Sequence, residues 1–191
     1  MEPIFTLPYS EYCVAIRLQD LFKANDGYSI FIPMSRQEKG VDLLLAKRQD
    51  DRTVSITIQV KTSRTYSPKP TSSVTSNPRK YYTWFNNFDV PTQADYIFLA
   101  CLYPPEEGRT NKNASSWWSP VILVFTQAEM VSFLGNINTR KGTRDKMFGF
   151  GFDKPTMIFQ TRGDKDGIEK DYSNHLLQNQ VESIRSKFEN K

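Results

Sequence analysis

The sequence predicts an α/β fold in which a mixed β-sheet is flanked by helices. Apolar residues recur at helical spacing near both ends of the chain, and between them several short runs are apolar or alternate with polar residues. The chain has 191 residues, of which 38% are hydrophobic and 13% aromatic. This is enough to bury one core and too little for two comfortable ones, so we expect a single domain over residues 1–191.

The N-terminal third predicts a helix followed by an antiparallel meander. Val14, Leu18 and Phe22 share one face of a helix expected over residues 10–24, with Ser10 as its N-cap. Three strands are expected at 28–32, 41–46 and 54–61, separated by a polar turn through Gly40 and a turn over 49–52. This is an αβββ order.

The remaining two-thirds predict further strands and two helices. Strands are expected at 96–102, 121–125 and 156–160, a helix capped by Thr126 to about residue 134, and a final helix over 173–188. Residues 62–80 are rich in Ser, Thr and Pro and predict a long loop. Gly and basic residues fill 135–151, so no element is expected there.

Composition narrows the class of protein. The net charge of +4 and pI of about 9.0 are compatible with a polyanionic partner. Cys13 and Cys101 are the two cysteines, too few for a disulfide framework or a thiolate zinc site. No leader and no apolar run of about 20 residues is visible, so we expect a cytoplasmic protein with no membrane association. His175, the single histidine, is expected at the surface, which argues against enzymes that need a histidine base.

The strand expected at 54–61 carries the first chemical signal. Its apolar residues alternate with polar ones, so Gln59 and Lys61 share a face and lie about 7 Å apart. An ordinary solvent-facing strand is the alternative interpretation. The neighbouring strand begins with Asp42 ahead of an apolar run, where an acid is unfavourable unless a cation meets it. Asp42 can also be the last residue of the Gly40 turn.

The first helix adds a third residue. Glu11 precedes Val14 and Leu18 by three and seven positions, so it projects from the stripe that faces the core. It can instead serve only to favour the helix dipole. Pairing of the second and third strands as a hairpin brings Asp42 near Gln59 and Lys61, and a helix packed on that sheet brings Glu11 within reach.

This arrangement resembles the PD-(D/E)xK nuclease superfamily, which includes type II restriction enzymes and Holliday-junction resolvases. The resemblance covers residues 10–61: Glu11, then Gly40-Val41-Asp42, then Gln59-Val60-Lys61. It implies a restriction-endonuclease-like core and a magnesium-dependent endonuclease that hydrolyses DNA phosphodiester bonds. Gln59 departs from the usual Asp or Glu, so the site has one negative ligand fewer.

The resemblance also implies a role for each residue. Asp42, the side-chain oxygen of Gln59 and the backbone carbonyl of Val60 would bind Mg²⁺, or Mn²⁺ in its place, with Glu11 as an outer or second-metal ligand. Lys61 would activate the attacking water or stabilise charge at the phosphate. Cleavage of both DNA strands by one site per chain would suggest a homodimer.

A basic stretch follows the proposed catalytic strand. Between Arg52 and Phe88 there are six Lys and Arg residues and no Asp or Glu. Such a stretch can contact a phosphate backbone or be a solvated loop. The candidates for nucleic-acid binding are Arg64, Lys69, Arg79 and Lys80. Aromatic residues over 81–85 can stack on unpaired bases, although most are expected in the core. Trp117 and Trp118 are adjacent, and one of them is a candidate partner contact.

Two alternatives to an active nuclease remain. The first is a nuclease-fold module, catalytically degenerate because of Gln59, that holds nucleic acid without cutting it. The second is a partner subunit of a defence or repair system that binds another protein.

Overall fold

The computed structural model describes residues 7–33, 39–67, 79–103 and 119–189. The helices are α1 (Leu7–Leu21), α2 (Gln127–Gly135) and α3 (Leu177–Glu189), with short 3-10 turns η2 (Ala24–Asp26) and η3 (Ser173–His175). The strands are β1 (Tyr28–Phe31), β2 (Leu43–Gln49), β3 (Arg52–Tyr66), β4 (Tyr81–Asn86), β5 (Tyr96–Tyr103), β6 (Ser119–Thr126), β7 (Met147–Lys154), β8 (Met157–Arg162) and β9 (Lys170–Asp171). Lys69, Trp117 and Trp118 lie outside the described residues.

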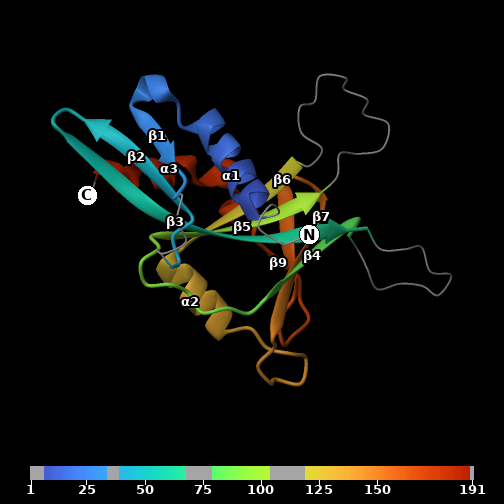
Figure 1. Ribbon diagram of the computed structural model, residues 1–191. Coiled ribbons are helices and arrows are strands. Elements are labelled where there is room, and N and C mark those ends of the chain that lie inside the picture. The colour runs from blue at the N-terminus through green and yellow to red at the C-terminus, as the bar shows by residue number, and fades with distance from the viewer. Residues whose placement is uncertain (1–6, 34–38, 68–78, 104–118, 190–191) are drawn as a thin grey trace, which may run out of the picture.

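One long strand, β3, joins two groups of strands. In the first group it pairs with β2 and β5, which continue to β1 and β6; in the second its end pairs with β4, which continues to β7, β8 and β9. The β3–β5 ladder is parallel and the other described ladders are antiparallel. Figure 1 shows β3 crossing the whole molecule. The expected mixed sheet with flanking helices is confirmed.

Two hydrophobic clusters occupy the two faces of the β2–β3–β5–β6 sheet. On one face α1 and α3 pack through residues such as Leu18 and Ile184 against Ile58 and Val60. On the other face α2 and the Phe side chains of β7 pack against β5 and β6. Figure 1 shows α1 and α3 on one side of this sheet and α2 on the other. The stripe of Val14, Leu18 and Phe22 along α1 and just past its end therefore buries the face that its spacing predicted, whereas Leu176, just before α3, packs in the second cluster.

Local signals placed several elements correctly. Thr126 caps α2 as expected, and Glu129 completes a capping box with it. The hairpin of β2 and β3 turns through Asp50 and Asp51, and Asp50 has the left-handed backbone (φ 43°) that a tight two-residue turn requires. The first helix begins earlier than expected and ends at Leu21 rather than near residue 24.

Two expectations about irregular segments were wrong. The expected loop over 62–80 begins with five residues of strand, because β3 continues to Tyr66 and pairs with β4. The segment 135–151 contains the start of β7, in which Phe148, Phe150 and Phe152 point into the second cluster. The glycines between them suggested a loop, but both are buried on the other face of the strand, where Trp84 covers Gly149 and Arg79 covers Gly151 so closely that a Cβ does not fit.

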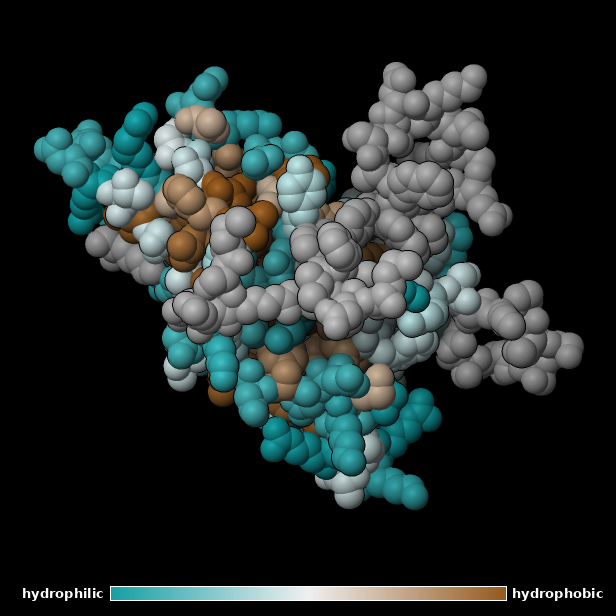
Figure 2. Space-filling view, in the orientation of Figure 1, coloured by the Kyte–Doolittle hydropathy of each residue, from teal (hydrophilic) through white to brown (hydrophobic). Residues whose placement is uncertain are grey.

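The surface is polar over most of the visible face, with hydrophobic residues gathered over α1 and β1 (Figure 2). Exposed large hydrophobic residues of this end include Tyr12, Ile16, Phe31 and Ile32. None of the helices in the described parts of the chain has the length and apolar character needed to cross a bilayer.

Candidate active site

The β2–β3 hairpin places Asp42 beside the Gln59-Val60-Lys61 segment. Its ladder ends at Leu43 opposite Ile58, and Asp42 extends it by one step. The Asp42 backbone N–H donates to the Ile58 carbonyl at 2.9 Å. The Val60 N–H in turn donates to Asp42 Oδ2 at 2.7 Å. The carboxylate is therefore fixed at the point where β2 leaves β3, which the sequence predicted from the hairpin alone.

Gln59 lies on the polar face of β3 with its oxygen unpaired. The side chain is buried at 8% exposure, and Oε1 accepts no hydrogen bond within the described structure. A buried amide oxygen without a donor costs about 1–3 kcal/mol, so most such atoms in proteins have a partner. An oxygen in this state, one strand from a fixed carboxylate, has the chemistry that a hard cation would satisfy.

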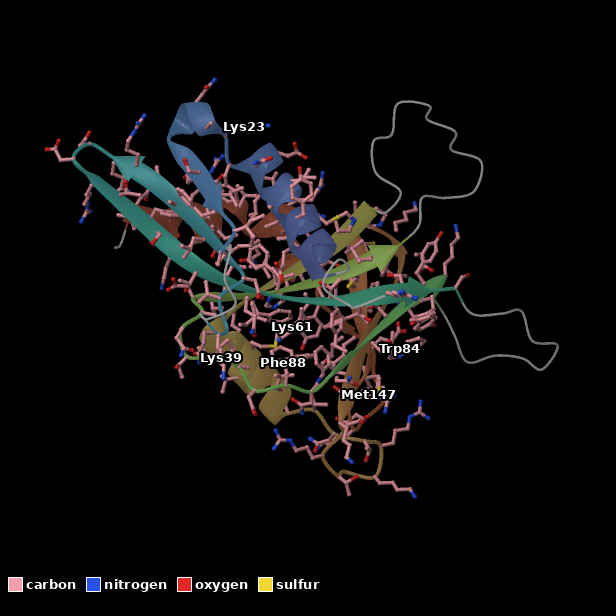
Figure 3. All side chains as sticks on the ribbon, in the orientation of Figure 1. Lys23, Lys39, Lys61, Trp84, Phe88 and Met147 are labelled. Atoms are coloured by element: carbon pink, nitrogen blue, oxygen red, sulfur yellow. The ribbon has the colours of Figure 1, made fainter. Side chains whose placement is uncertain are left out.

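Lys61 follows Gln59 on the same face of β3. Its Nζ lies 5.2 Å from the centre of the Phe88 ring, and Figure 3 shows the two residues near the middle of the molecule. Among the described residues Lys61 forms no ion pair. A cation held by an aromatic face keeps its N–H donors for another acceptor.

The segment between β4 and β5 closes over this region. Gly40 has φ +87°, and a Cβ at this position would lie 2.5 Å from Pro91 Cβ, so the turn before Asp42 needs glycine. Two residues before Gln59 in β3, the Thr57 N–H donates to Asp95 Oδ2 at 2.9 Å. The Thr57 hydroxyl donates to the Gln93 carbonyl at 2.6 Å. Residues 88–95 therefore line the polar face of β3 from Thr57 to Lys61.

Asp95 is a site residue that sequence reasoning missed. Its neighbour Tyr96 pairs with Ile58 in the parallel β3–β5 ladder, which puts the carboxylate opposite Thr57. The signal available in the sequence was an acid immediately before a buried strand, the same signal that singled out Asp42. The hydrogen bonds between Thr57 and Asp95 fix the part of the site that lies beside the start of β5.

Comparisons with known proteins give no family. No protein-family model matches the chain, and neither does any curated protein or solved structure. The site is therefore interpreted from its own geometry.

Glu11 approaches from the other side of the sheet. It is half-buried on α1, which packs on the face of β3 that carries Ile58 and Val60, whereas Gln59 and Lys61 lie on the opposite face. Across the described ranges, no group of three or more His, Cys, Asp or Glu side chains could hold a metal ion. The role of Glu11 as an outer ligand stays a prediction.

The other oxygens that the resemblance assigns to Mg²⁺ come from three residues. They are the Asp42 carboxylate, the unpaired Gln59 Oε1 and the Val60 carbonyl, all contributed by one hairpin. Proteins commonly bind Mg²⁺ through one or two carboxylates and leave several positions to water and substrate phosphate. The hairpin offers one carboxylate and two neutral oxygens toward such a set.

The four residues proposed for nucleic-acid binding have different environments. Arg64 is exposed on β3. Arg79 is engaged inside the protein: its guanidinium pairs with Asp153 at 3.1 Å and Glu169 at 2.6 Å, and these carboxylates raise its pKa. The Lys80 Nζ lies 5.1 Å from the Tyr81 ring. Of the described three, Arg64 and Lys80 are thus exposed at the surface, whereas Arg79 is held by carboxylates.

A second basic group borders the site. Arg144 and Lys146 line an open hollow of about 640 Å³ together with Phe88, the residue under the Lys61 ammonium. Asp89 and Asp145 also line it, and Asp145 is paired with Arg162 through two bonds of 3.1 Å. Exposed cations therefore continue from Lys61 past Phe88 toward β7.

His175 is not the surface residue expected from the sequence. It is half-buried in η3, where its Nδ1 lies 2.9 Å from the Val124 carbonyl and its ring stacks on Phe125 at a centroid distance of 4.4 Å. The helical spacing of the last segment could not reveal this contact, because Val124 lies 51 residues earlier.

Proposed function

We propose that this chain is a metal-dependent endonuclease that hydrolyses phosphodiester bonds of DNA, with a restriction-endonuclease-like core and a Gln-x-Lys form of the PD-(D/E)xK site. The observation that carries the proposal is the hydrogen bond from Val60 N–H to Asp42 Oδ2, which holds the carboxylate against the Gln59–Lys61 segment. Such a reaction needs a fixed carboxylate, an oxygen for the ion and a lysine for the phosphate. Asp42, Gln59 and Lys61 offer these, and among the described residues the Gln59 Oε1 accepts no hydrogen bond and Lys61 forms no ion pair.

Each residue has a definite role in this proposal. Asp42 and Gln59 would hold the ion with the Val60 carbonyl, and Glu11 would act as an outer ligand. Bound Mg²⁺ supplies positive charge that polarises the phosphate and acidifies a water molecule. Lys61 donates hydrogen bonds to a non-bridging phosphate oxygen and stabilises the charge that grows there. Phe88 holds the lysine stem in place so that the ammonium is oriented before substrate arrives.

Nicking of supercoiled plasmid with Mg²⁺ or Mn²⁺ tests the proposal. Wild-type protein should cleave, and Lys61→Ala should lose at least a hundredfold in rate, a typical effect for a group that stabilises transition-state charge. Lys23→Ala is the matched control, because Lys23 is an exposed lysine at the end of α1, far from Lys61 (Figure 3). If plasmid, single-stranded DNA and RNA all stay intact with both ions, the nuclease proposal fails.

One observation favours a second candidate, a nucleic-acid-binding module with no cleavage. The proposed ion site offers a single carboxylate, and one oxygen of that carboxylate already accepts the Val60 N–H. A weakened ion site would leave the basic residues and Lys61 to bind DNA. Salt-dependent DNA binding by wild type without any cleavage would support this second function. Cleavage by wild type would exclude it.

A further inference from the structure

The end of β3 and the neighbouring strand β4 carry aromatic residues on the face that points away from the second cluster. Thr65 pairs with Thr83 and Tyr66 with Tyr82, so the alternation of β3 and β4 separates two sets of side chains. Thr65, Thr83 and Phe85 are buried toward the second cluster. The set on the opposite face is Arg64, Tyr66, Tyr82 and Trp84.

Three of these residues form a row of rings. The Tyr66 and Trp84 centroids are 5.5 Å apart, and Tyr82 and Trp84 stack at 6.1 Å with an interplanar angle of 12°. Tyr66 is 51% exposed and Trp84 37% exposed, whereas Tyr82 is buried. Exposed rings supported by a buried ring are fixed in orientation and still open to a partner.

The neighbouring strand β7 supports Trp84 from the other side. Trp84 pairs with Gly149, and a Cβ on Gly149 would lie 2.5 Å from the Trp84 ring. The ring therefore rests where any side chain of residue 149 would be. The Ser63 hydroxyl also donates to the Trp84 carbonyl at 2.6 Å, which ties the backbone of β4 to β3.

Positive charge lies at the Tyr66 and Trp84 end of this row, whereas at the Tyr82 end Arg79 is paired with Asp153 and Glu169. Arg64 is exposed and lies on the same face, in the position opposite Trp84 when the β3–β4 register is continued by one pair. The stretch from Arg52 to Phe88, which supplies β3 and β4, contains no Asp or Glu. A ligand that matches this surface has flat rings at regular intervals and negative charge between them.

We propose that Tyr66 and Trp84, together with Arg64, form a binding surface for single-stranded nucleic acid. Unpaired bases stack on exposed aromatic side chains and their phosphates pair with arginine, while the bases of a duplex are covered by their own neighbours. The surface lies on the face of β3 that points away from Lys61. Figure 3 shows Trp84 well separated from Lys61 and Phe88. It is a second contact surface, and binding to it does not need the Asp42 site to cleave.

Fluorescence anisotropy with a labelled oligothymidine of about 15 nucleotides tests this surface directly. The measurement is made at low salt with EDTA, so that no cleavage interferes. Tyr66→Ala and Trp84→Ala should each weaken binding at least about tenfold, which corresponds to the lower half of the range for loss of one stacked base. Trp84→Phe, which keeps a ring, should bind within about threefold of wild type. Phe31→Ala removes an equally exposed ring from the distant strand β1 and should change nothing.

Different results separate this surface from the proposed active site. Loss of oligothymidine binding in Tyr66→Ala, with normal binding in Lys61→Ala, supports a separate surface whether or not the protein cleaves plasmid. Binding of wild type to a duplex of the same length as tightly as to the single strand overturns the inference. So does unchanged binding by both Tyr66→Ala and Trp84→Ala, provided that their circular dichroism spectra match that of wild type.

Discussion

The carboxylate of Asp42 accepts a 2.7 Å hydrogen bond from the backbone N–H of Val60, a residue eighteen positions later on the neighbouring strand. The bond gives Asp42 a structural role that exists before any ion or substrate is considered. It takes the place of a ladder bond just before β2 begins, and it fixes the carboxylate beside Gln59 and Lys61. The effects of Asp42 substitutions on stability and on activity must therefore be measured separately.

Asp42→Asn and Asp42→Ala should separate these two roles. Alanine leaves the buried Val60 N–H without an acceptor and should cost about 1–3 kcal/mol in the free energy of unfolding. Asparagine keeps an oxygen in the same place and should cost about 1 kcal/mol or less. Both should lose plasmid cleavage, because neither supplies a charge. Urea unfolding beside plasmid nicking measures this, with the exposed turn residue Asp51→Ala as control. Equal stability of Asn and Ala variants would contradict the structural role.

Gln59→Met should remove activity without loss of stability. Methionine has a similar volume, and it eliminates an oxygen that accepts no hydrogen bond among the described residues. The unfolding free energy should stay the same or rise by about 1 kcal/mol. Gln160→Met is the matched control: Gln160 is equally buried, but its Nε2 donates to the Arg162 carbonyl at 3.3 Å, so this variant should lose stability. A large loss in Gln59→Met would mean that its oxygen is satisfied in solution.

Asp145 should stabilise the fold in a pH-dependent way. Its side chain is 10% exposed, and the hydrogen bonds from Arg162 hold its pKa below the ordinary value of 3.8. A lowered folded-state pKa stabilises the protein above about pH 3.8, and that contribution is lost as the pH falls through the folded-state pKa. Asp145→Asn should therefore be roughly 1–2 kcal/mol less stable than wild type at pH 7 and pH 5, since Arg162 is partly exposed and screened.

Urea unfolding at pH 7, 5 and 2.5 measures the difference between wild type and Asp145→Asn. The gap should be smaller at pH 2.5 than at pH 5, because pH 2.5 lies below the ordinary pKa of 3.8 and the unfolded chain then binds a proton that the folded chain resists. A gap of constant size across this range would show that the effect of the substitution comes from packing rather than from charge.

Gly149→Ala should displace Trp84. The new Cβ would lie 2.5 Å from the Trp84 ring and 3.0 Å from the Thr83 carbonyl, so the ring must move. Overpacking of this kind costs about 1–3 kcal/mol, and oligothymidine binding should weaken with it. The cost should be smaller in a Trp84→Ala background, which removes the closer contact. Gly135→Ala, with nothing within 4 Å of its Cβ, is the control. Unchanged stability and oligothymidine binding in Gly149→Ala would show that Trp84 does not rest on β7.

The sequence by itself determined the local arrangement of the candidate site. The alternation over 54–61 fixed which side chains share a face, and the two-residue turn at Asp50-Asp51 fixed the pairing of β2 with β3. Once Gln49 pairs with Arg52, Asp42 must come opposite Gln59. The capping residue of α2 and the buried stripes of α1 and α3 followed from equally short spacings. In each case the residues are close in the sequence, so few alternative arrangements of their side chains exist.

Only the tertiary structure decided contacts between distant segments. The continuation of β3 to Tyr66 depends on pairing with β4, and the strand state of 147–154 depends on Phe148, Phe150 and Phe152 finding a core. Arg79 is bound to carboxylates 74 and 90 residues away, which the count of basic residues could not show. The bond between Thr57 and Asp95 spans 38 residues. Such contacts depend on which folded surfaces meet, and chain spacing alone does not specify that.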